Sequence, residues 1–104
     1  MILVGRYLSP FVRRVATTLN FYDMDFENQP LQHTGDDIPS LRKLNPVGRV
    51  PALIVNDSLT LVDSGNILDY LDREVGAEKS LTPLTGNDRT AVMNIMGIAT
   101  GVDE

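Results

Sequence analysis

The sequence contains no cysteine, which excludes disulfide bonds, thiolate metal sites and a cysteine nucleophile in this chain. It has one histidine, His33, and no convincing Ser/His/Asp arrangement for nucleophilic catalysis. No hydrophobic run approaches the length of a membrane span, and the apolar residues 1–4 are too short for a signal peptide. We therefore expect a soluble protein of a reducing compartment, the cytoplasm, without a metal site or membrane association.

Basic residues are also scarce, since 9 Lys and Arg stand against 14 Asp and Glu, for a net charge of −5. This balance argues against nucleic-acid binding, which needs clustered basic side chains. The chain has 104 residues, 42% of them hydrophobic and 22% charged. This composition is ordinary for a globular chain, and the length suits one domain, or one domain with a piece of another.

The first third of the chain predicts a strand, a helix and a second strand. Residues 2–4 form a short apolar run that is typical of a buried strand. Apolar residues then recur at helical spacing over residues 11–22, and Ser9 and Pro10 suit the N-cap and the first helical position. Residues 26–31 are polar and interrupted by a proline, which favours an edge strand.

The middle of the chain predicts a loop over residues 33–37, a short helix over residues 38–44 and then a tight turn. Two apolar runs follow, separated by the turn signal Asn-Asp-Ser, and indicate an antiparallel hairpin. Pro51 opens the first run directly after the turn. Its peptide bond with Val50 is therefore a candidate for the cis form.

Asp63 or Ser64 caps the next predicted helix, which carries apolar residues on one face and stops at Gly76. The order β-α-β followed by β-β-α indicates a compact α/β domain that is complete by about residue 79. Residues 80–87 are typical of a linker, and residues 88–104 predict a further helix with a strong apolar stripe.

Three motifs occur in order along these elements: Ser-Pro-Phe-x-Arg-Arg-Val at residues 9–15, Asn-Pro-x-Gly-Arg-Val-Pro-x-Leu at 45–53, and Asp-Ser-x-x-Ile-x-x-Tyr-Leu at 63–71. Each motif alone is weak, but three in order at these spacings resemble a glutathione S-transferase. The resemblance implies a thioredoxin-like βαβ-ββα domain with a four-stranded mixed sheet over residues 1–79. It further implies a linker over residues 80–87 and the start of an all-α domain over residues 88–104.

The resemblance also assigns glutathione-binding roles. In the family, the main chain before a cis-proline holds the cysteinyl part of glutathione, and here that role belongs to Val50 with Pro51 as the structural cis-proline. Ser64 and the helix start are expected to hold the γ-glutamyl carboxylate, with Asp63 near the α-amino group. The chemistry agrees, since unpaired main chain can accept a peptide as an added strand and a helix N-terminus attracts anions. A plain turn and an ordinary helix cap are the alternative interpretations.

Ser9 is the candidate for thiol activation, because a helix N-terminus lowers the pKa of a thiol and a hydroxyl can donate to the sulfur. Tyr7 is its rival, since related enzymes use Tyr, Ser or Cys for this task, and Ser9 can also be only a helix cap. Arg49 is the candidate for the glycyl carboxylate, with His33 as a second candidate. Many relatives carry Lys or His near residues 36–37, where this chain has two acids.

These assignments imply a glutathione transferase that uses glutathione as co-substrate, conjugates it to a small electrophile, and forms a homodimer as the full-length protein. A role in detoxification follows from the family, but nothing in the sequence specifies the electrophile. We expect the 104-residue chain alone to be inactive or weakly active, because the family binds its second substrate mainly against the helical domain. The alternative is a non-catalytic relative that serves as a protein-interaction or regulatory module. Arg13 and Arg14 are assigned to packing, ion pairs or the domain boundary.

Overall fold

The computed structural model describes residues 1–103, which form two compact units, Met1–Asp69 and a second unit that starts at Tyr70. The first unit contains a four-stranded sheet of order β2-β1-β3-β4. Its strands are β1 (Ile2–Val4), β2 (Glu27–Gln29), β3 (Ala52–Asn56) and β4 (Leu59–Val62). β1 pairs with β2 in parallel, whereas β3 is antiparallel to both β1 and β4. The predicted mixed sheet, with its parallel unit and its hairpin, is confirmed.

The helix α1 (Pro10–Phe21) forms as the sequence predicts. Ser9 is its N-cap, with extended backbone angles and its Oγ accepting a hydrogen bond from the Val12 N–H at 3.4 Å. Pro10 follows in the first turn, where its missing N–H would have no helical partner. The buried side chains of α1 lie on one face: Val12, Val15, Ala16 and Leu19. This stripe is the helical periodicity that the sequence contains.

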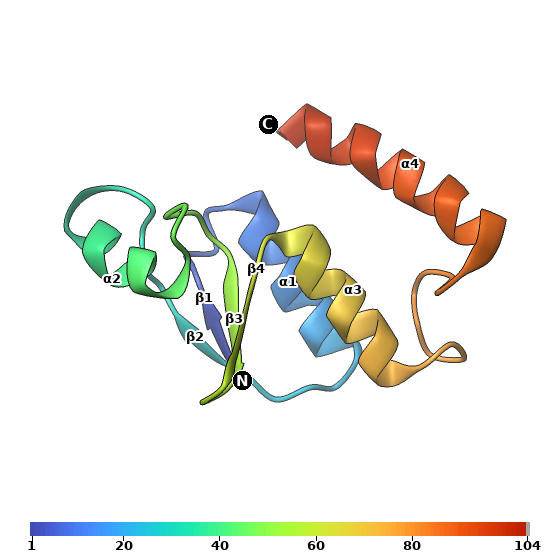
Figure 1. Ribbon diagram of the computed structural model, residues 1–104, viewed down its shortest axis with the longest axis horizontal. Coiled ribbons are helices and arrows are strands. Elements are labelled where there is room, and N and C mark those ends of the chain that lie inside the picture. Colours follow the sequence, from blue (N-terminus) through green and yellow to red (C-terminus); the bar gives the residue numbers. More distant parts are fainter. Residues whose placement is uncertain (104) are drawn as a thin grey trace. The chain divides into compact units, whose positions relative to one another are not determined.

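The sheet lies between α1 on one side and α2 (Ile38–Leu44) on the other (Figure 1). Alternate strand residues point to opposite faces, so β1 and β3 supply side chains to both layers. Leu41 of α2 packs with Val4 and Ala52, and all three side chains are fully buried. This second layer positions the loop that joins α2 to β3.

Residues 35–37 differ from the sequence prediction, which placed them in a loop. Gly35–Asp37 form a short 3₁₀ helix, η1, that runs directly into α2. Single 3₁₀ turns are common where α-helices begin, and no sequence period can reveal a segment of three residues. The predicted loop is therefore shorter than expected.

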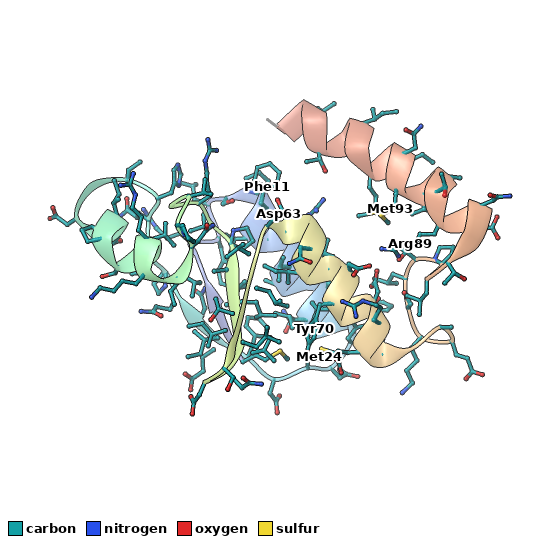
Figure 2. All side chains as sticks on the ribbon, viewed as in Figure 1. Phe11, Met24, Asp63, Tyr70, Arg89 and Met93 are labelled. Atoms are coloured by element: carbon teal, nitrogen blue, oxygen red, sulfur yellow. The ribbon has the colours of Figure 1, made fainter. Side chains whose placement is uncertain are left out.

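The helix α3 (Ser64–Val75) leads from the first unit into the second, and α4 (Gly86–Asp103) follows after a turn-rich segment. α4 begins two residues before the predicted start at residue 88, and its predicted continuation to Glu104 lies outside the described residues. In the second unit, Thr82 donates a hydrogen bond from Oγ1 to the buried Asp72 Oδ2 at 2.7 Å. Arg89, marked in Figure 2, donates from Nη1 to the Pro83 carbonyl at 3.0 Å.

Two absences apply to residues 1–103. None of their helices has both the length and the apolarity that crossing a membrane requires. They also contain no group of three or more His, Asp or Glu side chains that is placed to hold a metal ion.

Candidate functional site

The main chain at Val50 lies at the border of the sheet, outside its hydrogen-bonded ladders. The ladders of β3 reach only to Ala52, which pairs with Val4 on one side and Val62 on the other. The Val50–Pro51 peptide bond is cis. Within residues 1–103, neither the N–H nor the C=O of Val50 makes a hydrogen bond. An extended peptide can therefore pair with these two groups as an added strand.

Asn45 holds the loop that presents Val50. Its buried side chain donates from Nδ2 to the Arg49 carbonyl at 3.1 Å and accepts from the Val47 N–H at 3.0 Å. Its own carbonyl accepts from the Gly48 N–H at 2.8 Å. Sequence reasoning identified Asn45 only as a turn residue and missed this anchoring role. The Asn-Pro-x-Gly turn signal is the feature from which it can be inferred.

Gly5 is the point where Val50 meets the first turn of α1. A Cβ built at Gly5 would lie 2.5 Å from Val12 Cγ2 and 3.0 Å from Val50 Cβ. Gly5 also has φ +133°, which a residue with a side chain rarely adopts. The close packing that Gly5 permits brings the start of α1, with its cap Ser9, next to the Val50 loop.

The loop before Ser9 is tied to α1 by Arg13. The guanidinium donates from Nη1 to the carbonyls of Tyr7 at 2.8 Å and Leu8 at 3.0 Å. Arg13 was assigned to packing, ion pairs or the domain boundary, and its loop-holding role was missed. An exposed arginine in a first helical turn carries no sequence signal for such bonds. Tyr7 itself is 46% exposed, so its hydroxyl is not locked into the core.

Ser9 combines a cap with an available donor. Its Oγ accepts from the Val12 N–H, and a serine hydroxyl has one O–H donor besides its acceptor lone pairs. The O–H makes no hydrogen bond within residues 1–103. Ser9 can therefore cap α1 and still donate a hydrogen bond to the sulfur, so the two roles that the sequence allows are compatible.

The start of α3 lies across the sheet from Val50. Ala52, two residues after Val50, pairs with Val62, two residues before Ser64, so the Val50 loop and the start of α3 lie at the same end of the β3–β4 pair. Asp63 stands at the junction of β4 and α3 (Figure 2). The structure thus brings Ser9, Val50 and Ser64, which are far apart in sequence, to one end of the sheet.

Asp63 is the residue that caps α3. Its Oδ2 accepts hydrogen bonds from the Gly65 N–H at 3.1 Å and the Asn66 N–H at 3.3 Å. Its backbone is left-handed, with φ 73°, a conformation that Asp tolerates better than most side chains. The sequence allowed either Asp63 or Ser64 in this role, and the geometry selects Asp63.

The cap leaves Ser64 as the available donor at the helix start. Two of the first N–H groups of α3 are bonded to Asp63, so an anion there has to use the Ser64 N–H and hydroxyl. Ser64 is 5% exposed, and its hydroxyl has no hydrogen-bond partner within residues 1–103. Arg14 Nη2 lies 3.6 Å from the Cβ position of Gly65, which adds positive charge beside this helix end.

The two cation candidates differ in their placement. Arg49 is exposed and directly precedes Val50. His33 is exposed between β2 and η1, and within residues 1–103 no hydrogen bond joins it to the loop that carries Arg49. Asp37, one of the two nearby acids, accepts from the Gln32 N–H at 2.8 Å and so closes its own loop. The geometry therefore associates Arg49, but not His33, with the Val50 loop.

Residues 3–79 match the protein family described as "Glutathione S-transferase, N-terminal domain". Glutathione S-transferase 3 of Zea mays is 39% identical over 88 residues, which cover 82% of this chain and 39% of the maize protein. The family match covers the part of the chain that contains all three motifs.

Solved structures also resemble the chain. A glutathione S-transferase from Methylobacillus flagellatus KT, with glutathione bound, superposes with a TM-score of 0.84 at 27% identity, covering 97% of this chain and 49% of that one. A glutathione transferase family member from Pseudomonas fluorescens Pf-5, also with bound glutathione, has a TM-score of 0.76 at 29% identity, covering 97% and 51%. The chain thus spans about half the length, or less, of these proteins.

Proposed function

The chain belongs to the glutathione S-transferase family, and on this premise we propose that it forms the glutathione-binding domain of a glutathione transferase. Its four-stranded mixed sheet with flanking helices is the thioredoxin-like fold of that family. The observation that carries the proposal is the unpaired main chain of Val50, flanked by Ser9 and Ser64 at two helix starts. The glutathione bound in two structural relatives supports it.

Glutathione pairs with Val50 as a short added strand, through the N–H and C=O of its cysteinyl residue. The γ-glutamyl end then lies at α3, where the Ser64 hydroxyl and N–H receive the α-carboxylate. Asp63, whose Oδ2 caps the helix, offers its carboxylate to the α-ammonium group. The glycyl end extends toward Arg49, which supplies a positive charge. His33 is the more distant alternative for that end.

Ser9 donates its O–H to the glutathione sulfur and so stabilises the thiolate, aided by the N-terminus of α1. The thiolate sulfur forms a bond to an electrophilic carbon of the second substrate while the bond from that carbon to its leaving group breaks. The leaving group departs with the bonding electrons, and the thiol proton passes to solvent. Tyr7 is the alternative donor. No metal takes part in this proposed reaction.

The proposal also covers the domain division, the oligomeric state and the cellular location of the full-length protein. We propose that residues 1–79 form one domain, as predicted, and that the linker from residue 80 ends where α4 begins, at Gly86. A cytoplasmic homodimer that conjugates electrophiles in detoxification is the form in which we propose the full-length protein acts. The absence of cysteine supports a reducing compartment.

Calorimetric titration of the chain with glutathione tests the binding proposal. We expect saturable binding that Ser64→Ala weakens, because the variant removes a hydroxyl that makes no hydrogen bond within residues 1–103 and that we propose binds the γ-glutamyl carboxylate. Ser58→Ala, in the exposed turn between β3 and β4, is the matched control and should bind like the wild type. Absence of binding would refute the proposed function. Binding without conjugation of a generic electrophile by the full-length protein would favour the non-catalytic alternative.

A further inference from the structure

The guanidinium of Arg13 is held directly beside Ser9. Arg13 lies in the first turn of α1, and its side chain folds back over the preceding loop because helical side chains point toward the N-terminus. Its Nη1 donates to the Tyr7 carbonyl at 2.8 Å and to the Leu8 carbonyl at 3.0 Å. The Leu8 carbonyl belongs to the peptide bond that joins Leu8 to Ser9. The Ser9 N–H also closes this loop, by donating to the Arg6 carbonyl at 3.1 Å.

The two carbonyl bonds leave one side of the guanidinium open. A guanidinium has five N–H donors, and the two on Nη1 are both used by the loop. Within residues 1–103 the donors on Nε and Nη2 make no hydrogen bond, and Arg13 is exposed to solvent. Nε and Nη2 lie side by side, so they can bind both oxygens of a carboxylate. Because the loop already fixes the side chain, an anion that binds there orders little more of it.

The charge around Ser9 also favours an anion. Residues 1–22 contain Arg6, Arg13 and Arg14 but no Asp or Glu, although the whole chain has a net charge of −5. In the part of the chain that the structure describes, neither Arg6 nor Arg13 forms an ion pair. Their positive charges are therefore not neutralised by the protein, and they attract anionic ligands toward the start of α1.

The second substrate has to lie next to this loop. In the proposed reaction the glutathione sulfur accepts a hydrogen bond from Ser9, and the electrophilic carbon has to approach that sulfur to about 3–3.5 Å. The rest of the electrophile then lies close to the loop before Ser9, where Tyr7 is 46% and Leu8 78% exposed. These side chains offer apolar contact, and Arg13 offers a cation beside them. The glutathione carboxylates do not need Arg13, since they are assigned to Ser64 and Arg49.

We propose that Arg13 binds an acidic group of the second substrate and makes the site selective for electrophiles that carry a carboxylate or a similar anion. The inference rests on the proposed glutathione transferase function and names a substrate class for it. Arg13 is then a specificity-determining residue in addition to a support of the loop. The two roles differ in their consequences, because loss of loop support affects every ligand at Ser9, whereas loss of the cation affects only anionic ligands.

The test compares S-(4-carboxybenzyl)glutathione with S-(4-carbamoylbenzyl)glutathione, which have nearly the same size but differ by one negative charge. Both already contain the carbon–sulfur bond, so their binding requires no catalysis. Calorimetry gives the ratio of the two Kd values, and the Kd of glutathione itself, for the wild type, Arg13→Gln and Lys79→Gln. Lys79 is the matched control, because it is an exposed cation in the turn after α3 and its side chain makes no hydrogen bond within residues 1–103. Thermal melting of each variant establishes that it is folded.

We expect the wild type and Lys79→Gln to bind the carboxylate ligand roughly three- to tenfold more tightly than the amide, a range suited to an exposed guanidinium–carboxylate pair. Arg13→Gln should bring this ratio close to one. A wild-type ratio of one, an unchanged ratio in Arg13→Gln, or equal weakening of both ligands would overturn the inference. So would a ratio that Arg6→Gln abolishes and Arg13→Gln leaves intact. If the wild type does not bind even glutathione, the proposed function itself fails, an outcome distinct from the others.

Discussion

Replacing Ser9 by alanine separates the two roles that the structure gives to this residue. The hydroxyl caps α1 by accepting from the Val12 N–H, and its O–H remains available for the glutathione sulfur. Ser9→Ala removes both interactions and leaves the other N–H groups at the start of α1 in place. We expect a higher pKa of the bound glutathione thiol, with its affinity at low pH nearly unchanged.

The magnitude follows from the two contacts. A hydrogen bond to an ionised group is worth about 1.5–3 kcal/mol, and about 1.36 kcal/mol corresponds to one pKa unit. The thiol pKa should therefore rise by about one to two units. The cap bond is long at 3.4 Å. Its loss should lower the free energy of unfolding by about 0.5–1 kcal/mol, the lower part of the range for N-caps.

The assay is a pH titration of the thiolate ultraviolet absorbance at saturating glutathione. Ser9→Thr is the matched control, because threonine keeps both the hydroxyl and the capping ability, and its titration should stay close to that of the wild type. Identical titrations of wild type and Ser9→Ala would show that Ser9 is only a cap. Tyr7→Phe would then be the variant to titrate next.

Three further perturbations follow from the geometry. Asp63→Ala should lower the free energy of unfolding by about 1–3 kcal/mol, because it removes the α3 cap at a residue with φ 73°. Asp63→Asn should keep the cap and tolerate this backbone conformation. An equal loss of unfolding free energy in the two variants, measured by denaturant melts, would contradict this. Gly5→Ala should cost about 2–5 kcal/mol, because strain and a steric clash combine there. Gly35 also has a positive φ, +69°, but no atom within 4 Å of its Cβ position, so Gly35→Ala should lower the free energy of unfolding by only about 1–2 kcal/mol. Similar losses in Gly5→Ala and Gly35→Ala would contradict the steric clash at Gly5. Partial burial and the hydrogen-bonded Glu74 carboxylate raise the pKa of the Tyr70 hydroxyl. The hydroxyl of Tyr70 therefore loses its proton at lower pH in the unfolded chain than in the folded chain, and the free energy of unfolding should fall as the pH rises past about 10. Tyr70→Phe should make the free energy of unfolding depend less on pH in melts above about pH 10. The same pH dependence in the variant and the wild type would contradict this.

The predictable part of the fold rests on local patterns. Ser9 and Pro10 predict the start of α1, because helix capping depends on only a few adjacent residues. Gly76 ends α3 as expected, since its φ of +84° suits a helix stop. The 3₁₀ turn at Gly35–Asp37 escaped prediction because three residues contain no period.

The site was predictable in its residue types but not in its contacts. Val50 and Ser64 could be named in advance because they belong to motifs with characteristic spacing. The contacts of Arg13 could not be predicted, because an exposed arginine looks the same in sequence whether it faces solvent or binds a loop carbonyl. Its role depends on which carbonyl lies within reach.

The amino-acid sequence alone determined the element order, the mixed sheet and the family resemblance, because periodicity, caps and turn residues act over a few neighbouring positions. Only the tertiary structure decided that Asp63 rather than Ser64 caps α3, since both residue types are good caps and the choice depends on backbone angles at a strand–helix junction. It also decided that Gly5 joins Val50 to the start of α1. Distances between residues far apart in sequence arise from packing, and no local pattern encodes them.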